Sequence, residues 1–121
     1  MRRPRFAAKA RRIVAAQVAL FGEPARYDFG TYTFLADYLP WVSGDGMEHR
    51  NSTALICQRS DLPQQQQEKT GDGYTTLLGL ISHEYFHTWN VKRLKPASLC
   101  RIDYARENYT ELLWFFEGFT S

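Results

Sequence analysis

The chain has 121 residues, enough for one domain with a single core. Hydrophobic residues make up 44% of it and charged residues 23%. This ordinary globular composition excludes a disordered acidic tail, a collagen-like rod and a coiled coil. No apolar run approaches the about 20 residues of a transmembrane helix. The two cysteines, Cys57 and Cys100, are too few for a disulfide scaffold, and we expect two buried thiols.

The net charge of +2 is unevenly distributed along the chain. Basic side chains crowd residues 1–12, which contain no acidic residue, whereas the remainder is net acidic. A basic start of this kind is compatible with nucleic acid or an anionic membrane as a partner. The simpler interpretation is the solvated first part of a helix, because no aromatic and basic pattern continues beyond residue 12. We therefore expect no nucleic-acid partner.

The first half of the chain predicts one helix and two strands. Apolar residues recur at three- and four-residue spacing over 5–21, the period of an amphipathic helix. Alternating apolar residues predict strands over 31–39 and 51–58. Between the strands, Gly44-Asp45-Gly46 predicts a turn that leads into the second one. In the second strand, Thr53, Leu55 and Cys57 alternate with Ala54 and Ile56, so the two sets are expected on opposite faces.

The second half predicts two helices. One is expected to begin near Asp72 or Thr75, either of which can cap it, and to end near Asn90. Residues 108–111 match the reciprocal capping pattern with Glu111 as its acidic member, so the other helix is expected to begin near Asn108. This apolar helix is cut at the end of the chain, so we expect residues 1–121 to be a fragment of a longer domain. The aromatic side chains expected in the core are Trp89, Trp114, Phe115 and Phe116.

The strongest chemical signal is His83-Glu84-Tyr85-Phe86-His87, an H-E-x-x-H motif inside a predicted helix. Residues four apart lie on one helix face, so both imidazoles can reach one zinc ion. Glu84 lies one step further round the helix, where a carboxylate can accept a proton from the water on the metal. The alternative is two histidines that happen to lie one turn apart.

A catalytic zinc site needs a third protein ligand. Glu117 is the first candidate, because a carboxylate in an apolar helix has to be paired or metal-bound. A salt bridge with Arg93 or Arg106 is the alternative role for Glu117. The competing ligands, of which His49 ranks first, are His49, Asp103, Glu107 and Glu111.

The segment 44–51 combines the predicted glycine turn with polar side chains at the start of a strand. An edge strand beside a zinc site can pair with an extended peptide through backbone hydrogen bonds. A carboxylate at the start of that strand, such as Glu48, can hold a free amino terminus as an ion pair. A glycine turn that merely enters an edge strand is the alternative.

Taken together, three segments resemble the glycyl aminopeptidase family. These segments are SGDGMEHRNSTAL, ISHEYFHTWNVKRLKP and RENYTELLWFFEGFTS, and the resemblance covers about residues 12–121. Members of this family are gluzincin metallopeptidases that often carry a PDZ domain. The resemblance implies an α+β, thermolysin-like zincin catalytic domain, with active-site helices beside a small antiparallel edge sheet. It also implies that residues 1–121 are part of that domain, truncated after the third zinc-ligand segment.

The resemblance also implies the roles of individual residues. His83, His87 and Glu117 would be the ligands of one Zn²⁺ ion, and Glu84 the general base. Gly46-Met47-Glu48-His49 resembles the G-x-M-E-N exopeptidase motif, in which Glu48 would bind the α-amine of the substrate. His49 stands where the related motif has asparagine.

These implications predict a zinc aminopeptidase that releases small residues such as glycine from peptides and proteins with a free N-terminus. The alternatives are a zinc endopeptidase, in which Glu48 has no such role, and a non-catalytic peptide-binding fragment. Related enzymes also place an oxyanion donor after the third ligand, so we expect the 121 residues alone to be a poor enzyme.

Overall fold

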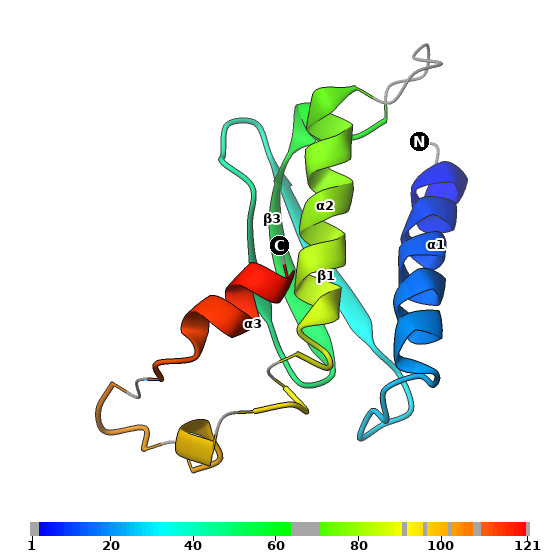
Figure 1. Ribbon diagram of the computed structural model, residues 1–121. Coiled ribbons are helices and arrows are strands. Elements are labelled where there is room, and N and C mark those ends of the chain that lie inside the picture. Colours follow the sequence, from blue (N-terminus) through cyan, green and yellow to red (C-terminus); the bar gives the residue numbers. More distant parts are fainter. Residues whose placement is uncertain are drawn as a thin grey trace.

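The computed structural model describes residues 3–63, 71–90, 92–95, 97–101, 103–107 and 110–120 (Figure 1). None of the helices among these residues is long and apolar enough to cross a membrane. The elements, in chain order, are α1 (Arg3–Phe21), β1 (Thr33–Leu39), β2 (Asp45–Glu48), β3 (Ser52–Gln58), the 3-10 helix η1 (Arg59–Asp61), α2 (Asp72–Phe86), the 3-10 helix η2 (Ala97–Leu99) and α3 (Leu113–Thr120).

The three strands form one sheet in the order β1-β3-β2. β2 and β3 form an antiparallel hairpin, whereas β1 and β3 are parallel. The predicted α+β class is confirmed, but the prediction of an antiparallel sheet is wrong, since the sheet is mixed. A parallel pair needs a crossover connection of about a dozen residues, and residues 40–51 supply it by way of β2. Alternation of apolar residues does not distinguish the two arrangements, because both have a period of two.

α2 packs against the sheet through one of its faces. Leu77 and Ile81 join Leu55 and Cys57 of β3 in a buried cluster. β3 alternates as predicted, with Thr53 and these two residues buried on one face. One turn beyond Ile81, the α2 face continues into a second cluster of aromatic residues, built around Tyr85 and Trp89.

α1 lies beside α2 and packs against it (Figure 1). Phe21 stacks on Trp89, with ring centroids 4.5 Å apart. The Gln17 amide donates hydrogen bonds to the backbone carbonyl and hydroxyl of Ser82, at 2.9 and 3.0 Å. The predicted amphipathic helix at the start of the chain is therefore confirmed, and it holds α2 from the side away from β2.

The predicted turn at 44–46 is wrong. Asp45 and Gly46 belong to β2, where they pair with Ile56 and Leu55. Gly44 precedes the strand in a loop. The left-handed backbone that turns need occurs instead at Gly22 and Gly30. The glycine at 46 serves close packing, as described below.

The limits of two helices also differ from the prediction. α2 begins at Asp72, as predicted, but its N-cap is Gly71, so neither Asp72 nor Thr75 caps it, and it ends at Phe86 instead of extending to Asn90. α3 begins at Leu113, which leaves Glu111 outside the helix, and the predicted cap Asn108 lies outside the described residues. Local hydrogen bonds explain both starts. The Thr75 amide bonds to the Gly71 carbonyl at 2.9 Å, and the Leu112 amide bonds to the Thr110 hydroxyl at 3.2 Å.

Several side chains expected in the interior are exposed. Trp89 and Phe116 are buried as predicted, but Trp114 is 70% exposed and Phe115 37%. The apolar helix α3 turns only one face toward α2, so its other face points away from the described core. Of the two thiols, Cys57 is buried and Cys100 is exposed, so the prediction holds for the first and is wrong for the second.

The core cluster predicts a clear difference between two isoleucines. Ile81→Ala should lower the free energy of unfolding by about 2–4 kcal/mol, because Ile81 is 2% exposed and its loss leaves a cavity. Ile56→Ala should cost about 1 kcal/mol or less, because Ile56 is 42% exposed. Urea denaturation followed by circular dichroism measures both changes, and equal losses would contradict this description of the core.

Candidate metal centre

α2 presents the two motif histidines on the face away from its packed side. Leu77, Ile81 and Tyr85 bury one face, and a position two residues further along is rotated by about 200°. His83 and His87 therefore lie together on the opposite face. His87 directly follows the last residue of α2 and keeps the helical hydrogen bond from its amide to the His83 carbonyl. The two Nε2 atoms are 3.2 Å apart.

Glu117 reaches the two histidines from α3. Its carboxylate oxygens lie 3.3 Å from Nε2 of His83 and 3.5 Å from Nε2 of His87. Two donors on a tetrahedral zinc ion, with bonds of about 2.0–2.2 Å, lie about 3.3–3.6 Å apart. The three separations of 3.2, 3.3 and 3.5 Å agree with that spacing. Oε2 of Glu117 lies nearest His83 and Oε1 nearest His87, so the donor spacings of these three residues suit one zinc ion.

The tautomer of His87 also suits a metal ligand. Its Nδ1 lies 2.9 Å from the Asn90 carbonyl oxygen, which can only accept a hydrogen bond. Nδ1 therefore carries the ring proton, and Nε2 keeps a lone pair directed toward His83 and Glu117. A carbonyl partner on the far nitrogen is the usual support of a metal-binding imidazole.

Glu84 lies beside the histidines in a buried position. It is 5% exposed, and its Oε2 has no hydrogen-bond partner among the described residues. Burial raises the pKa of Glu84 to about 7; His87 opposes this shift, and the nearby carboxylates, with Glu48 first among them, add to it. A buried carboxylate of this kind is a candidate proton acceptor for a water molecule at the metal.

A second group of potential ligands shares His87. Ligand atoms of Glu48, Glu84 and His87 also lie within 4.8 Å of one another. However, the Lys92 ammonium is 3.5 Å from the Glu48 carboxylate, and a cation there opposes a second cation at the same oxygen. We therefore assign the metal to the group that contains both histidines and Glu117.

A cavity of about 760 Å³ lies between β2 and α2 and reaches two of these functional residues. β2 forms one edge of the sheet, whereas the strand predicted at 51–58 corresponds to β3 and is central, so the expectation of an edge strand there is wrong. The cavity is large enough for several residues of a peptide. Its lining includes Gly44, Gly46, Leu80, His83, Glu84 and Thr120.

Gly46 allows β2 to approach α2 closely. A Cβ atom added at Gly46 would lie 2.5 Å from Cγ, Cδ and Oε1 of Glu84. Real Cβ atoms do not approach other atoms so closely, so any larger residue would have to displace Glu84 or the strand. The absence of a side chain at position 46 thus decides where the Glu84 carboxylate lies.

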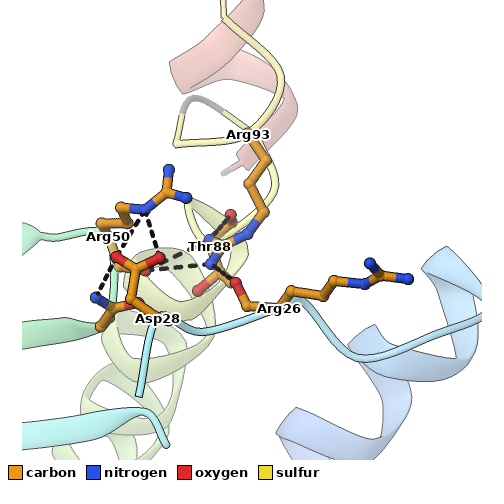
Figure 2. A network of polar contacts seen from close by, with 6 residues as sticks. Arg26, Asp28, Arg50, Thr88 and Arg93 are labelled. Atoms are coloured by element: carbon orange, nitrogen blue, oxygen red, sulfur yellow. Dashed lines mark hydrogen bonds and ion pairs between the residues drawn. The ribbon is translucent and has the colours of Figure 1, made fainter. Parts of the chain in front are cut away.

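Arg93 ties the β2–β3 hairpin to the end of α2. Figure 2 shows its guanidinium between three backbone segments. It donates to the carbonyls of Arg26 at 2.5 Å, Thr88 at 2.7 Å and Arg50 at 3.4 Å. The Arg50 side chain in turn pairs with Asp28 at 3.0 Å. Arg93 therefore joins the segment just after α2 to the backbone at Arg26 and Arg50.

The remaining third-ligand candidates lie elsewhere. His49 is exposed, with Nδ1 3.1 Å from the Met47 carbonyl, and among the described residues it joins no group of three ligating side chains. Asp103 pairs with Arg106 at 3.0 Å. Glu107 and Glu111 are exposed. The alternative partners proposed for Glu117, Arg93 and Arg106, bind backbone carbonyls and Asp103 respectively.

Comparison with known proteins agrees with this site. Residues 76–121, which include the two histidines and Glu117, match the model of the M61 glycyl aminopeptidase family. The crystal structure of an aminopeptidase N family protein from Idiomarina loihiensis is also similar, with 44% sequence identity and a TM-score of 0.89. The chain is thus similar to the glycyl aminopeptidase family over residues 76–121. The similarity to the Idiomarina protein covers 96% of this chain and 19% of that one. No curated protein matches the chain.

The sequence signals predict the candidate metal-site residues but not the residues that support them. The Asn90 side chain binds the Phe116 carbonyl next to Glu117, and the Lys92 side chain pairs with Glu48. Neither residue belongs to a recognisable motif. The sequence predicts Gly46 as part of a turn, whereas it lies in β2. A close packing contact between β2 and α2 leaves no local signal, because it depends on residues far apart in the sequence.

Two glycines that line the cavity predict opposite effects of alanine. Gly46→Ala should lower the free energy of unfolding by about 1–3 kcal/mol, because the new Cβ overlaps Glu84. Gly79→Ala should raise it by about 0.5–1 kcal/mol, because Gly79 lies inside α2 with open space around it. Urea denaturation of both variants is the measurement. A change of the same sign in both would refute the close approach at position 46.

Proposed function

We propose that this chain carries the zinc site of a metallopeptidase that hydrolyses peptide bonds, and that the enzyme is an aminopeptidase. The observation that supports it most directly is the set of donor separations among His83, His87 and Glu117, which suits a tetrahedral zinc ion. The family match and the Idiomarina relative support a peptidase independently of that geometry. We also propose a thermolysin-like arrangement of the cleft.

The zinc ion would polarise the scissile carbonyl and lower the pKa of a water molecule. Glu84 would take the proton from that water and pass it to the departing amine, as the buried carboxylate nearest the ligands. β2 would pair with the extended substrate at the edge of the sheet, which orients the peptide along the cavity. The apolar α2–β3 core behind Glu84 keeps bulk water away from this carboxylate.

Glu48 would bind the α-ammonium of the substrate. It stands at the end of β2, with a ligand atom within 4.8 Å of those of Glu84 and His87. An amine held there lies within one residue of the reaction centre, which suits removal of the first residue only. Glycine is the residue released under this proposal, in keeping with the family.

An endopeptidase is the second candidate, and the ion pair between Lys92 and Glu48 favours it. If Lys92 stays paired during the reaction, the Glu48 charge is already balanced and no free amine is required. The two candidates differ in their response to acetylation of the substrate, because acetylation removes the ammonium charge.

Zinc content tests the ligand set. After dialysis, the wild-type chain should retain about one zinc ion, as one tetrahedral site requires. Circular dichroism checks beforehand that the chain is folded. Glu117→Gln should retain much less, whereas Glu84→Gln should retain as much as wild type, since Glu84 is assigned no bond to the metal. Turnover by the protein that contains this chain should fall by about 10²–10⁴-fold in Glu84→Gln. Normal zinc content in Glu117→Gln would show that the third ligand is misassigned.

Amine recognition is tested by binding, with glycinamide as the probe and N-acetylglycinamide as its uncharged counterpart. NMR titration of the zinc-loaded chain should show glycinamide binding about tenfold or more weakly to Glu48→Gln than to wild type, because a charged hydrogen bond is lost. The acetylated probe should bind both proteins equally weakly. Equal binding of the two probes to the wild type would favour the endopeptidase.

A further inference from the structure

Asn90 joins the two elements that carry the metal ligands. It lies just beyond α2, three residues after His87, and is 5% exposed. We infer that Asn90 is a positioning residue that holds Glu117 against the two histidines. This inference rests on the proposed zinc ligand set and adds to it a residue outside the ligands.

The Asn90 side chain binds α3 at two points. Its Nδ2 donates to the Phe116 carbonyl at 3.1 Å and to the Thr120 hydroxyl oxygen at 3.1 Å. Because the Phe116 carbonyl can only accept, the amide nitrogen must face α3, which fixes the orientation of the side chain. The two acceptors stand immediately before Glu117 and three residues after it. The side-chain amide therefore holds the stretch of backbone from which Glu117 projects.

The Asn90 backbone serves the other ligand. Its carbonyl accepts the Nδ1 proton of His87 at 2.9 Å, which leaves Nε2 of that ring available to the metal. A bridge to Leu94 holds the Asn90 backbone itself in place. One residue thus supports His87 through its main chain and Glu117 through its side chain. A substitution separates the two roles, since it removes the amide and leaves the carbonyl.

Such an anchor suits α3, because several of its described apolar side chains are largely exposed. Leu113 and Trp114 are 60% and 70% exposed, and Phe116 is the buried hydrophobic residue among the described side chains of α3. The Glu117 side chain is 48% exposed and extends from this weakly packed helix. Two hydrogen bonds from a buried amide are then a large part of what fixes the distance between α3 and α2. Without them, Glu117 would lie in the required place for a smaller fraction of the time.

The test is a double-mutant cycle on zinc affinity, measured by competition with a chelator. Asn90→Ala should weaken zinc binding by about 10–100-fold, the usual effect of removing an outer support of a ligand. If Asn90 acts through Glu117, the double variant Asn90→Ala/Glu117→Gln should bind zinc no more weakly than Glu117→Gln alone. Asn51→Ala is the matched control, because its amide bonds to Asp28 instead, and zinc affinity should stay within about twofold of wild type.

The outcomes separate the inference from the proposed ligand set. Independent, additive losses in the double variant would mean that Asn90 acts by general stabilisation, which overturns the inference. An unchanged affinity in Asn90→Ala would overturn it as well, while leaving the ligands as assigned. An unchanged affinity in Glu117→Gln would instead remove Glu117 from the site.

Thr120→Val provides the same test from the other side, should Asn90→Ala fail to fold. It removes one acceptor of the Asn90 amide and keeps a side chain of similar shape. A smaller loss of zinc affinity, absent in the Glu117→Gln background, supports the inference. A loss of equal size in both backgrounds contradicts it.

Discussion

The packing of α2 on β3 decides where the functional side chains of α2 lie. Burial of Leu77 and Ile81 against β3 fixes the rotation of the helix about its axis. That rotation turns His83 and His87 toward α3, because residues two positions apart point in nearly opposite directions. Glu84, between the two faces, meets β2 at the point where Gly46 leaves room for it. The core and the candidate metal centre are thus two faces of the same helix.

Negative charge accumulates on the functional face of α2. Glu48, Glu117 and Asp45 lie close enough to Glu84 that each of these three carboxylates raises its pKa. Lys92 offsets part of this charge at Glu48. A divalent cation between the histidines and Glu117 would offset more of it, so metal binding and stability of this face are expected to be linked. Under the proposed function, the same charge would favour a substrate with a positive amino terminus.

The local features of this structure could be predicted from the sequence, whereas the contacts between distant segments could not. The motif from His83 to His87 and the alternation around Leu55 depend on helix and strand periods, which a sequence displays directly. The parallel pairing of β1 with β3 depends on where the chain returns after residues 40–51, and alternation carries no such information. The exposure of Trp114 likewise depends on which face of α3 is turned toward α2. The contact from Asn90 to Phe116 fixes that face, and it joins residues far apart in the sequence.

The candidate site divides in the same way. Residue chemistry and the family resemblance predict the candidate ligands, including Glu117, from residue types that zinc requires, and the structure brings these residues together. The supports of those ligands are ordinary residues made important by position: an amide at Asn90, a missing side chain at Gly46 and a guanidinium at Arg93. Their roles depend on contacts between elements 26 or more residues apart, such as that from Asn90 to Phe116. Such roles are visible only once the chain is folded.

X-ray absorption at the zinc edge of the zinc-loaded chain tests the central claim most directly. The account predicts two imidazole nitrogens at about 2.0–2.1 Å and the remaining ligands as oxygens, with no sulfur. Three imidazoles would mean that His49 replaces Glu117 as the third ligand. One imidazole with carboxylate oxygens would place the ion among Glu48, Glu84 and His87 instead, and either result would contradict the assignment.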